Sequence, residues 1–310
     1  MNIDLPGTAS TSGWPAPGCP CASCGRLRTG GVRYEPFRVR IDGVALHDCV
    51  QDEIPGGLDV RGPNGGRLLI ADPDGRPEPR TVYDAVLLDL IGCPDHLGRL
   101  RDLGAVRSHT EIRAIHLDHR IRSPQELERR LAYWLAPREG PHRTLLLGGT
   151  RSGKSAEAEL RLMACPDVTY LATSAPRTDA EWADRVEAHR RRRPSWWKTI
   201  ETIALPEALR SAQGAVLVDG IGTWLAAAVD EANAWDDPYS IRPRLEELID
   251  AWRTTPARVI AVSDEVGLSL VPTTSSGRAF RDLLGHLNQG LAAESEEAAL
   301  VVAGRVMELP

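Results

Sequence analysis

The feature that most constrains this chain is a glycine-rich loop between a strand-like run and a helix-like run. Residues 148–155 read Gly-Gly-Thr-Arg-Ser-Gly-Lys-Ser, follow the apolar run at 144–147, and precede an amphipathic helical pattern. The spacing GxxxxGK[ST] in that context is typical of a phosphate-binding P-loop, whose backbone N–H groups surround nucleotide phosphates. The sequence therefore predicts a nucleotide site formed by Gly148, Gly149, Thr150, Arg151, Ser152, Gly153, Lys154 and Ser155.

The lysine of this loop is unusual in a chain that otherwise uses arginine. Lys154 and Lys198 are the only lysines among 37 basic residues, so a lysine retained in the loop indicates a specific role. A P-loop lysine reaches the β and γ phosphate oxygens, and the hydroxyl of Ser155 is placed to join Mg²⁺. Asp219 closes an apolar run and is the candidate metal carboxylate, although an aspartate before a glycine also suits a turn. We therefore expect Mg²⁺, with Lys154 and Asp219 as catalytic residues.

From residue 143 onward the sequence has a regular rhythm. Apolar runs without alternation are separated by amphipathic helical stretches, a pattern that indicates buried parallel strands with helices between them. We predict an α/β domain with a mostly parallel, doubly wound sheet of the P-loop, RecA-like kind. The predicted strands lie at 144–149, 168–174, 215–220, 257–263 and 298–304.

The first part of the chain has a different composition. Residues 1–35 are rich in Gly, Pro, Ser and Cys, which favours loops, and a helix with Ser123 as N-cap is predicted at 123–136. A proline-bounded polar connector at 137–142 follows, and we place the domain boundary there, which gives domains at 1–140 and 141–310. Short strand-like runs lie at 37–41, 67–71 and 85–91.

Charge and hydropathy exclude some classes of function. No run approaches the ~20 apolar residues of a membrane span, and the first residues have neither the basic nor the apolar region of a secretory signal. The net charge of −6 argues against a general nucleic-acid binder. We expect a cytoplasmic protein with no membrane and no nucleic-acid partner, and a small nucleotide as ligand.

A single histidine followed by four arginines is the next candidate feature. His189 lies in a predicted helix, and Arg190, Arg191, Arg192 and Arg193 follow it. Taken alone, a helical histidine and an arginine run describe a solvated surface. A P-loop in the same domain favours another interpretation, in which the arginines neutralise phosphates beside a histidine nucleophile. The residues alone leave both interpretations open.

Residues 143–310 resemble, over their whole length, the bifunctional adenosylcobinamide kinase/adenosylcobinamide-phosphate guanylyltransferase family. The P-loop is generic, but H-x-x-x-R-P-x-x-W at 189–197 and E-V-G-x-x-x-V-P at 265–272 make the resemblance specific. It implies that the enzyme phosphorylates adenosylcobinamide with ATP or GTP, and that His189 attacks the α-phosphate of GTP. The histidine-bound GMP would then pass to adenosylcobinamide phosphate, giving adenosylcobinamide-GDP in cobalamin biosynthesis. The resemblance also implies a homotrimer.

The same resemblance assigns nucleotide contacts outside the P-loop. Hydroxyls just after a predicted strand lie where α/β folds bind ligands, and Glu201 offers an acceptor for a guanine edge or ribose. Three positions depart from the family pattern, since Ala175 lacks a polar side chain, Ser269 replaces a glycine and Asp264 replaces an asparagine. The implied contacts are Thr173, Ser174, Ala175, Arg190, Arg191, Arg192, Arg193, Glu201 and Asp219.

The segment at 13–24 resembles the start of phosphodiesterase-type proteins of the metallo-β-lactamase fold. That resemblance implies a structural zinc held by Cys19, Cys21, Cys24 and His119, with His116 as the relic of a catalytic ligand. Three cysteines and one histidine make a closed zinc shell, whereas the alternative is three free thiols in a flexible terminus. The HxHxDH cluster of the hydrolases is absent and the region is short. We therefore expect a smaller, degenerate α+β domain without hydrolytic activity.

Two other functions remain compatible with the residues. The P-loop could belong to a nucleotide-switched regulatory or interaction module in which His189 is inert. The chain could also be a small-molecule kinase that has lost the transferase step.

Overall fold

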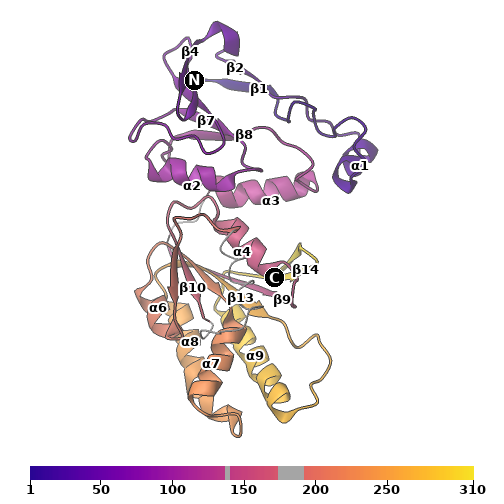
Figure 1. Ribbon diagram of the computed structural model, residues 1–310, viewed down its shortest axis with the longest axis vertical. Coiled ribbons are helices and arrows are strands. Elements are labelled where there is room, and N and C mark those ends of the chain that lie inside the picture. Colours follow the sequence, from indigo (N-terminus) through magenta and orange to yellow (C-terminus); the bar gives the residue numbers. More distant parts are fainter. Residues whose placement is uncertain (137–139, 174–191) are drawn as a thin grey trace. The chain divides into compact units, whose positions relative to one another are not determined.

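The computed structural model describes residues 1–136, 140–173 and 192–310, and Figure 1 shows its ribbon. The chain divides into two compact units. The N-terminal unit comprises Met1–Pro137 with Met163–Pro166, and the P-loop unit comprises Arg138–Leu162 with Asp167–Pro310. Each unit has its own sheets and its own hydrophobic core.

Two sheets form the N-terminal unit. The smaller sheet is antiparallel with the strand order β1–β2–β3. The larger has the order β4–β5–β6–β7–β8; its first three strands are antiparallel, and β6, β7 and β8 run parallel. The strands are β1 (Ile3–Gly7), β2 (Arg38–Ile41), β3 (Val44–Ala45), β4 (Val50–Ile54), β5 (Gly57–Arg61), β6 (Arg67–Ala71), β7 (Ala85–Leu88) and β8 (Glu111–Ala114).

Side chains from both sheets share one core. In β2 the buried Val39 and Ile41 alternate with exposed arginines, and they join a cluster that includes Val60 and Leu87. Ser123 caps the last helix of the unit as predicted, because its hydroxyl accepts the N–H of Glu126 at 3.2 Å. The helices are α1 (Ala22–Thr29), the short η1 (Leu46–Asp48), α2 (Pro94–Asp102) and α3 (Pro124–Leu135).

The apolar run at 85–91 is a strand only as far as Leu88. The carboxylate of Asp89 accepts the N–H groups of Ile91 at 3.2 Å and Gly92 at 2.8 Å. This local bonding turns the chain, so the apolar side chains of residues 90 and 91 are buried without continuing the strand.

A seven-stranded sheet organises the P-loop unit. Its strand order is β11–β10–β12–β13–β9–β14–β15, and every neighbouring pair is parallel except β14 with β15. This confirms the predicted mostly parallel α/β sheet. The strands are β9 (His142–Gly148), β10 (Val168–Ala172), β11 (Lys198–Glu201), β12 (Ala215–Asp219), β13 (Arg258–Asp264), β14 (Glu297–Val302) and β15 (Arg305–Leu309).

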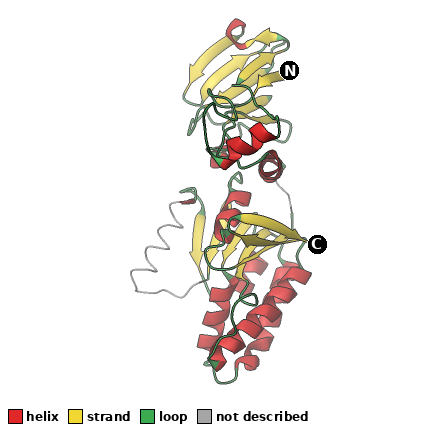
Figure 2. Cartoon of the chain, turned by 90° about the vertical axis from the view of Figure 1, so that its right-hand side faces the viewer, coloured by secondary structure: helices red, strands yellow, loops and turns green. Residues whose placement is uncertain are grey.

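Helices cover both faces of this sheet (Figures 1 and 2). Helix α4 packs on β9, β12 and β13, while α6 to α9 and the central strands build the large core on the opposite face. Within the described residues, no helix is both long and apolar enough to cross a membrane. The helices are α4 (Lys154–Leu162), α6 (Leu205–Ser211), α7 (Ile221–Glu231), the short η2 (Pro238–Ile241), α8 (Arg242–Thr254) and α9 (Ser275–Ala293).

Candidate nucleotide-binding site and metal centre

The P-loop connects the end of β9 to the first turn of α4. Two of its residues have positive φ angles, 57° at Arg151 and 98° at Gly153, which curve the backbone. Gly148 is tightly enclosed, since a Cβ there would lie 2.6 Å from the carbonyl oxygen of Val301. The sequence folds into a curved loop at a helix N-terminus, where N–H groups and the helix dipole favour phosphate.

The C-terminal hairpin supports this loop from one side. The N–H of Gly304, in the turn between β14 and β15, donates to the carbonyl of Ser152 at 2.7 Å. A Cβ on Gly153 would lie 3.2 Å from the Cα of Gly304, so the two backbones approach closely. The conformation of the phosphate loop therefore depends on a segment about 150 residues further along the chain.

Lys154 is already engaged within the loop. Its Nζ donates to the carbonyl of Gly149 at 3.2 Å and forms an ion pair with Oδ1 of Asp264 at 2.8 Å. Asp264 is the last residue of β13, the strand that pairs directly with β9. The lysine thus lies across the loop, the position from which a P-loop lysine reaches β and γ phosphates.

Ser155 and Asp219 form the predicted pair of metal ligands. The Ser155 hydroxyl donates to Oδ1 of Asp219 at 3.2 Å, and the phenol of Tyr170 donates to Oδ2. Burial first, and then the Asp219 carboxylate, raise the pKa of Tyr170, so the phenol stays protonated as a donor. One hydroxyl and one carboxylate are the hard oxygen ligands that Mg²⁺ prefers. The donor set therefore fits Mg²⁺.

Two further predicted contacts lie at the same edge of the sheet. Glu201 and Asp219 are each paired with Ala172 of β10 in the strand register, so both carboxylates end parallel strands at one level. Thr173 is fully buried, and its hydroxyl bonds Gly220 and Thr223, which orders the turn after Asp219. A direct contact between Thr173 and nucleotide remains a prediction.

The arginines after His189 are described in part. Arg192 donates to both carboxylate oxygens of Glu159 on α4, at 2.9 and 3.3 Å, and the side chain of Glu159 is only 3% exposed. The guanidinium of Arg193 lies over the ring of Tyr170, 3.6 Å from its centroid. The remaining predicted positions, Ser174, Ala175, His189, Arg190 and Arg191, lie outside the described residues.

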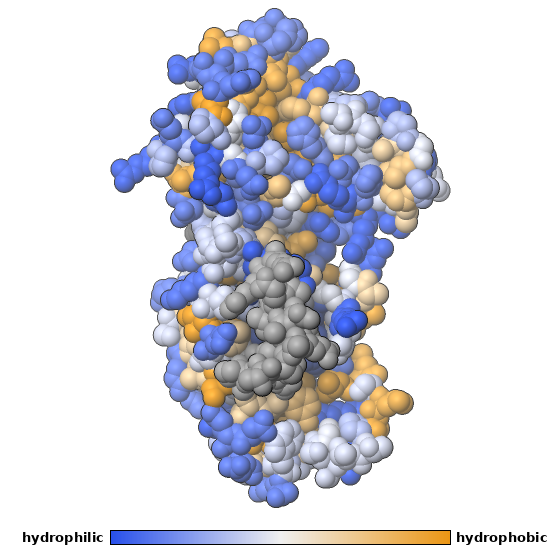
Figure 3. All heavy atoms as spheres, viewed as in Figure 1, coloured by the Kyte–Doolittle hydropathy of each residue, from blue (hydrophilic) through white to orange (hydrophobic). Residues whose placement is uncertain are grey.

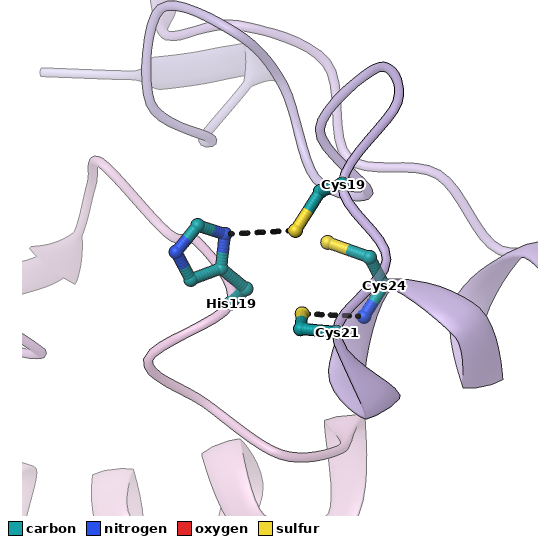
Figure 4. Close-up of side chains that lie close together, drawn as sticks. All are labelled: Cys19, Cys21, Cys24 and His119. Carbon is teal, nitrogen blue, oxygen red and sulfur yellow. Dashed lines mark hydrogen bonds between the residues drawn. The ribbon is translucent and has the colours of Figure 1, made fainter.

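In the N-terminal unit, the predicted zinc ligands come together although His119 is about 100 residues from the cysteines in the sequence. One ligand atom from each of Cys19, Cys21, Cys24 and His119 lies within 4.8 Å of the others, and Figure 4 shows the four side chains facing one another. A tetrahedral zinc with sulfur ligands at ~2.3 Å separates its ligands by about 3.8 Å. The four ligand atoms would therefore have to move only slightly closer together to bind zinc.

Hydrogen bonds around the cluster explain how distant segments meet. The hydroxyl of Ser23, at the start of α1, donates to the carbonyl of Ile121 and accepts the indole N–H of Trp14 at 3.1 Å. Trp14 is fully buried and stacks on Tyr34 with 4.9 Å between ring centroids. These contacts fix the loop that carries His119 against the cysteine loop without requiring a metal.

The carboxylates near His116 form ion pairs with an arginine of the same unit. Arg120 donates to Asp89 at 2.9 Å and to Asp118 at 2.8 Å. Burial opposes ionisation of Asp118, but its bonds to Arg120 lower its pKa overall. The His116 ring packs edge-on against Phe37. Asp89 and Asp118 therefore satisfy a guanidinium at the ends of β7 and β8, the position where parallel strands commonly present ligands.

Three residues of the site were not predicted. Tyr170 and Glu159 carry no local motif, and their roles depend on which strands and helices are neighbours. Asp264 had a usable signal, because it closes a buried strand as Asp219 does, although in the register of β12 and β13 Asp219 pairs with Val262, two residues before Asp264. Strand order decides which of these carboxylates reaches the lysine.

Comparison with known proteins identifies relatives of this chain. The profile of the family described as cobinamide kinase / cobinamide phosphate guanyltransferase matches residues 144–309. The bifunctional adenosylcobalamin biosynthesis protein CobU of Salmonella typhimurium is 36% identical over 173 residues, covering 52% of this chain and 95% of that protein. Its counterpart CobP of Pseudomonas aeruginosa is 40% identical over 173 residues, covering 54% and 96%.

Among solved structures, an ATPase from the type III secretion system of pathogenic bacteria is similar at a much lower level. The TM-score is 0.36 with 16% identity, over 55% of this chain and 54% of that chain. This similarity is too low to inform either the detailed fold or the function.

Proposed function

The chain belongs to the cobinamide kinase / cobinamide phosphate guanyltransferase family, and we infer that its P-loop unit catalyses both reactions. The relatives are named as bifunctional proteins of adenosylcobalamin biosynthesis, and their alignments with this chain cover 95% and 96% of their length. The observation that carries the inference to this chain is the geometry of the phosphate site. Lys154 contacts a carbonyl of the loop, and Ser155 contacts Asp219.

In the kinase step, the hydroxyl oxygen of adenosylcobinamide attacks the γ-phosphorus of ATP or GTP. A new O–P bond forms, the bond to the β,γ-bridging oxygen breaks, the hydroxyl proton is released, and the nucleoside diphosphate leaves. The N–H groups of the loop and Lys154 would hold the phosphates and stabilise charge on the transferred group. Mg²⁺ held by Ser155 and Asp219 would neutralise phosphate charge. Tyr170 would keep the second oxygen of Asp219 in place.

In the transferase step, we propose that a neutral imidazole of His189 attacks the α-phosphorus of GTP and pyrophosphate leaves. The phosphate oxygen of adenosylcobinamide phosphate then attacks the same phosphorus, which releases the histidine and yields adenosylcobinamide-GDP. Arg192 and Arg193 follow His189 closely in the sequence, and they contact Glu159 and Tyr170 of the P-loop unit. Those contacts support arginines close to the phosphate site. The roles of Ser174, Ala175, Arg190, Arg191 and Glu201 remain proposals from resemblance.

One experiment separates this function from its two alternatives. Incubation with α-labelled GTP should leave an acid-labile, alkali-stable label on the protein, and added adenosylcobinamide phosphate should remove it as adenosylcobinamide-GDP. A kinase without the transferase step would give no label but would phosphorylate adenosylcobinamide. A nucleotide-switched regulatory module would do neither.

For the N-terminal unit, we propose one structural zinc and no hydrolytic activity. The four clustered side chains of Cys19, Cys21, Cys24 and His119 would fill a tetrahedral shell, which leaves no position for an activated water. The contact of Arg120 with Asp89 and Asp118 supports the absence of a second metal centre there. A degenerate metallo-β-lactamase-like domain is the proposed origin of this unit.

A homotrimer is the proposed assembly, and the cytoplasm, where ATP and GTP are available, is the proposed location. The loop between β13 and α9 exposes a row of large apolar side chains, with Leu268 78%, Leu270 93% and Val271 65% exposed. Figure 3 shows apolar surface at this edge of the P-loop unit. Exposed apolar patches commonly mark contact surfaces. Light scattering would give about three times the chain mass for a trimer, and a monomer would contradict the proposal.

A further inference from the structure

The carboxylate of Asp264 occupies a position that neither transfer step uses. Its Oδ1 lies 2.8 Å from Nζ of Lys154, and the side chain of Asp264 is 42% exposed whereas that of Lys154 is 13% exposed. The cation that a triphosphate needs is therefore already bound by an anion of the chain itself. Phosphate oxygens must displace this partner or share the lysine with it.

The backbone holds Asp264 at this place. Asp264 pairs with Gly148 in the register of β13 and β9, and the next N–H, of Glu265, donates to the Gly148 carbonyl at 3.1 Å. On the other side, the amide of Asn288 on α9 donates to the carbonyl of Asp264 at 3.1 Å. The carboxylate also abuts the first turn of α7, because a Cβ on Gly222 would lie 3.0 Å from its Oδ2. A shift of the carboxylate away from the phosphates is therefore restricted.

A fixed anion beside the phosphate loop discriminates between ligands by charge. It repels the β and γ phosphate oxygens, which Lys154 would contact, and this repulsion is greatest when no cation accompanies them. A bound Mg²⁺ neutralises two negative charges of the triphosphate and so reduces its repulsion by Asp264. A nucleoside monophosphate places no β or γ group near the lysine and is affected least.

We propose that Asp264 is a specificity-determining residue of the nucleotide site, which pairs with Lys154 and selects Mg²⁺-bound over metal-free triphosphate. The inference rests on the proposed function only in that the P-loop binds a triphosphate. It concerns nucleotide binding and is independent of the acceptor and of His189.

The test is Asp264→Asn, which keeps the size of the side chain and an oxygen acceptor for Lys154 but removes the negative charge. Dissociation constants are measured by titration calorimetry for GTP in divalent-free buffer, for GTP with Mg²⁺, and for GMP. Metal-free GTP should bind at least about fivefold more tightly to the variant, since a partly exposed ion pair and a nearby like charge each contribute about that order. The gain should be smaller with Mg²⁺ and less than about twofold for GMP.

Asp236→Asn is the matched control, because it removes one negative charge from an exposed carboxylate of the same unit. It should leave all three constants unchanged. A second variant, Asp264→Ala, removes the acceptor as well and should show the same order of gains, which guards against an effect peculiar to the amide.

Two results would overturn the inference. Metal-free GTP binding to Asp264→Asn that is unchanged or weaker would remove the repulsive role. Equal tightening for GMP and both forms of GTP would indicate a general loosening of the loop. In either case wild-type protein still binds GTP, so the proposed function stands. A wild-type chain that binds no GTP would overturn both.

Discussion

Charged and polar groups at the phosphate loop are paired with one another. Lys154 contacts Asp264, and Asp219 accepts hydrogen bonds from Ser155 and Tyr170. These contacts fix the positions of Ser155 and Asp219, whereas nucleotide phosphates must compete with Asp264 for Lys154. The pairing also means that a single substitution changes the partner of another residue as well as its own contact.

Lys154→Ala should abolish both reactions, because both need a bound triphosphate and the lysine stabilises charge on it. Loss of such a contact typically lowers the rate by about 10²–10³-fold. Lys198→Ala is the control, since the chain's other lysine starts the edge strand β11 and is exposed. Steady-state assays of each step measure the effect. Guanylylation near the wild-type rate in Lys154→Ala would exclude a shared P-loop.

His189→Ala should separate the two activities. The variant should form no GMP adduct and no adenosylcobinamide-GDP, yet it should still phosphorylate adenosylcobinamide, because transfer to a hydroxyl needs no protein nucleophile. Adduct formation and phosphate transfer are measured on the same preparation, with circular dichroism to verify folding. Equal loss of both steps in a folded variant would argue against a dedicated nucleophile.

The sequence predicted those site residues whose positions are set locally. The spacing of the P-loop is enough to identify Lys154 and Ser155, and the end of a buried run is enough to propose Asp219. Tyr170 and Asp264 were not assigned roles, because the contact of Tyr170 with Asp219 depends on β10 lying beside β12, and that of Asp264 with Lys154 depends on β13 lying beside β9. The order of the strands in the sheet is set by three-dimensional packing and differs from their order in the sequence.

At the scale of elements, the same distinction explains which strands were predicted. The buried central strands appear in the sequence as continuous apolar runs. The strands β11 and β15 were missed, because they are short edge strands whose side chains are mostly exposed and in which charged residues lie among the apolar ones. The hairpin turn after β14, with positive φ at Ala303 and Gly304, reverses the chain where the prediction extended a strand.

Helix α4 is fastened to the C-terminal hairpin by a buried arginine. Arg161, with a side chain 1% exposed, donates to Glu157 at 2.9 Å, to Glu297 at 3.2 Å and to Glu308 at 3.1 Å. Arg161→Ala should lower the free energy of unfolding by about 3–5 kcal/mol, since it removes the buried guanidinium that binds carboxylates of both the helix and the hairpin. Urea unfolding of the P-loop unit within the full chain measures the change.

Arg244→Ala provides the comparison for this arginine. Arg244 pairs with Glu231 at the surface, with side chains 46% and 45% exposed, and its loss should cost no more than about 1 kcal/mol. If Arg161→Ala were no more costly than Arg244→Ala, the buried network would not anchor α4.

The cysteine cluster gives a prediction about metal content. Purified protein should contain about one zinc per chain, and Cys21→Ser should bring it towards zero, because a closed shell that loses one ligand binds far more weakly. Cys93→Ser, which changes a half-buried thiol outside the cluster, should retain the metal. Elemental analysis measures both. Two or more tightly bound metals per chain would reveal a second centre.

At the scale of the whole molecule, the catalytic residues and the zinc ligands belong to different units. Every residue assigned to the two transfer reactions follows residue 143, and the relatives align over nearly their full length with 52–54% of this chain. The aligned region, which is nearly the whole of those proteins, contains no counterpart of the N-terminal unit. The N-terminal unit therefore holds none of the residues assigned to the two reactions.

Deleting residues 1–137 should leave the kinase and transferase rates within about threefold of the full chain, because no assigned group is removed. Residues 163–166 group with the N-terminal unit, so the shortened protein should unfold at a lower temperature. Rates and melting temperature are measured together. A large loss of either rate in a folded truncation would mean that the N-terminal unit contributes to the site.

The contact of Gly304 with the phosphate loop has a practical consequence for handling the protein. A purification tag or reporter fused after Pro310 follows β15 by one residue, and the partner strand and turn of β15 support Ser152 and Gly153. A fusion at the other end of the chain joins a unit that carries none of the assigned reactive groups. Expression vectors for enzymology should therefore place the added sequence before Met1.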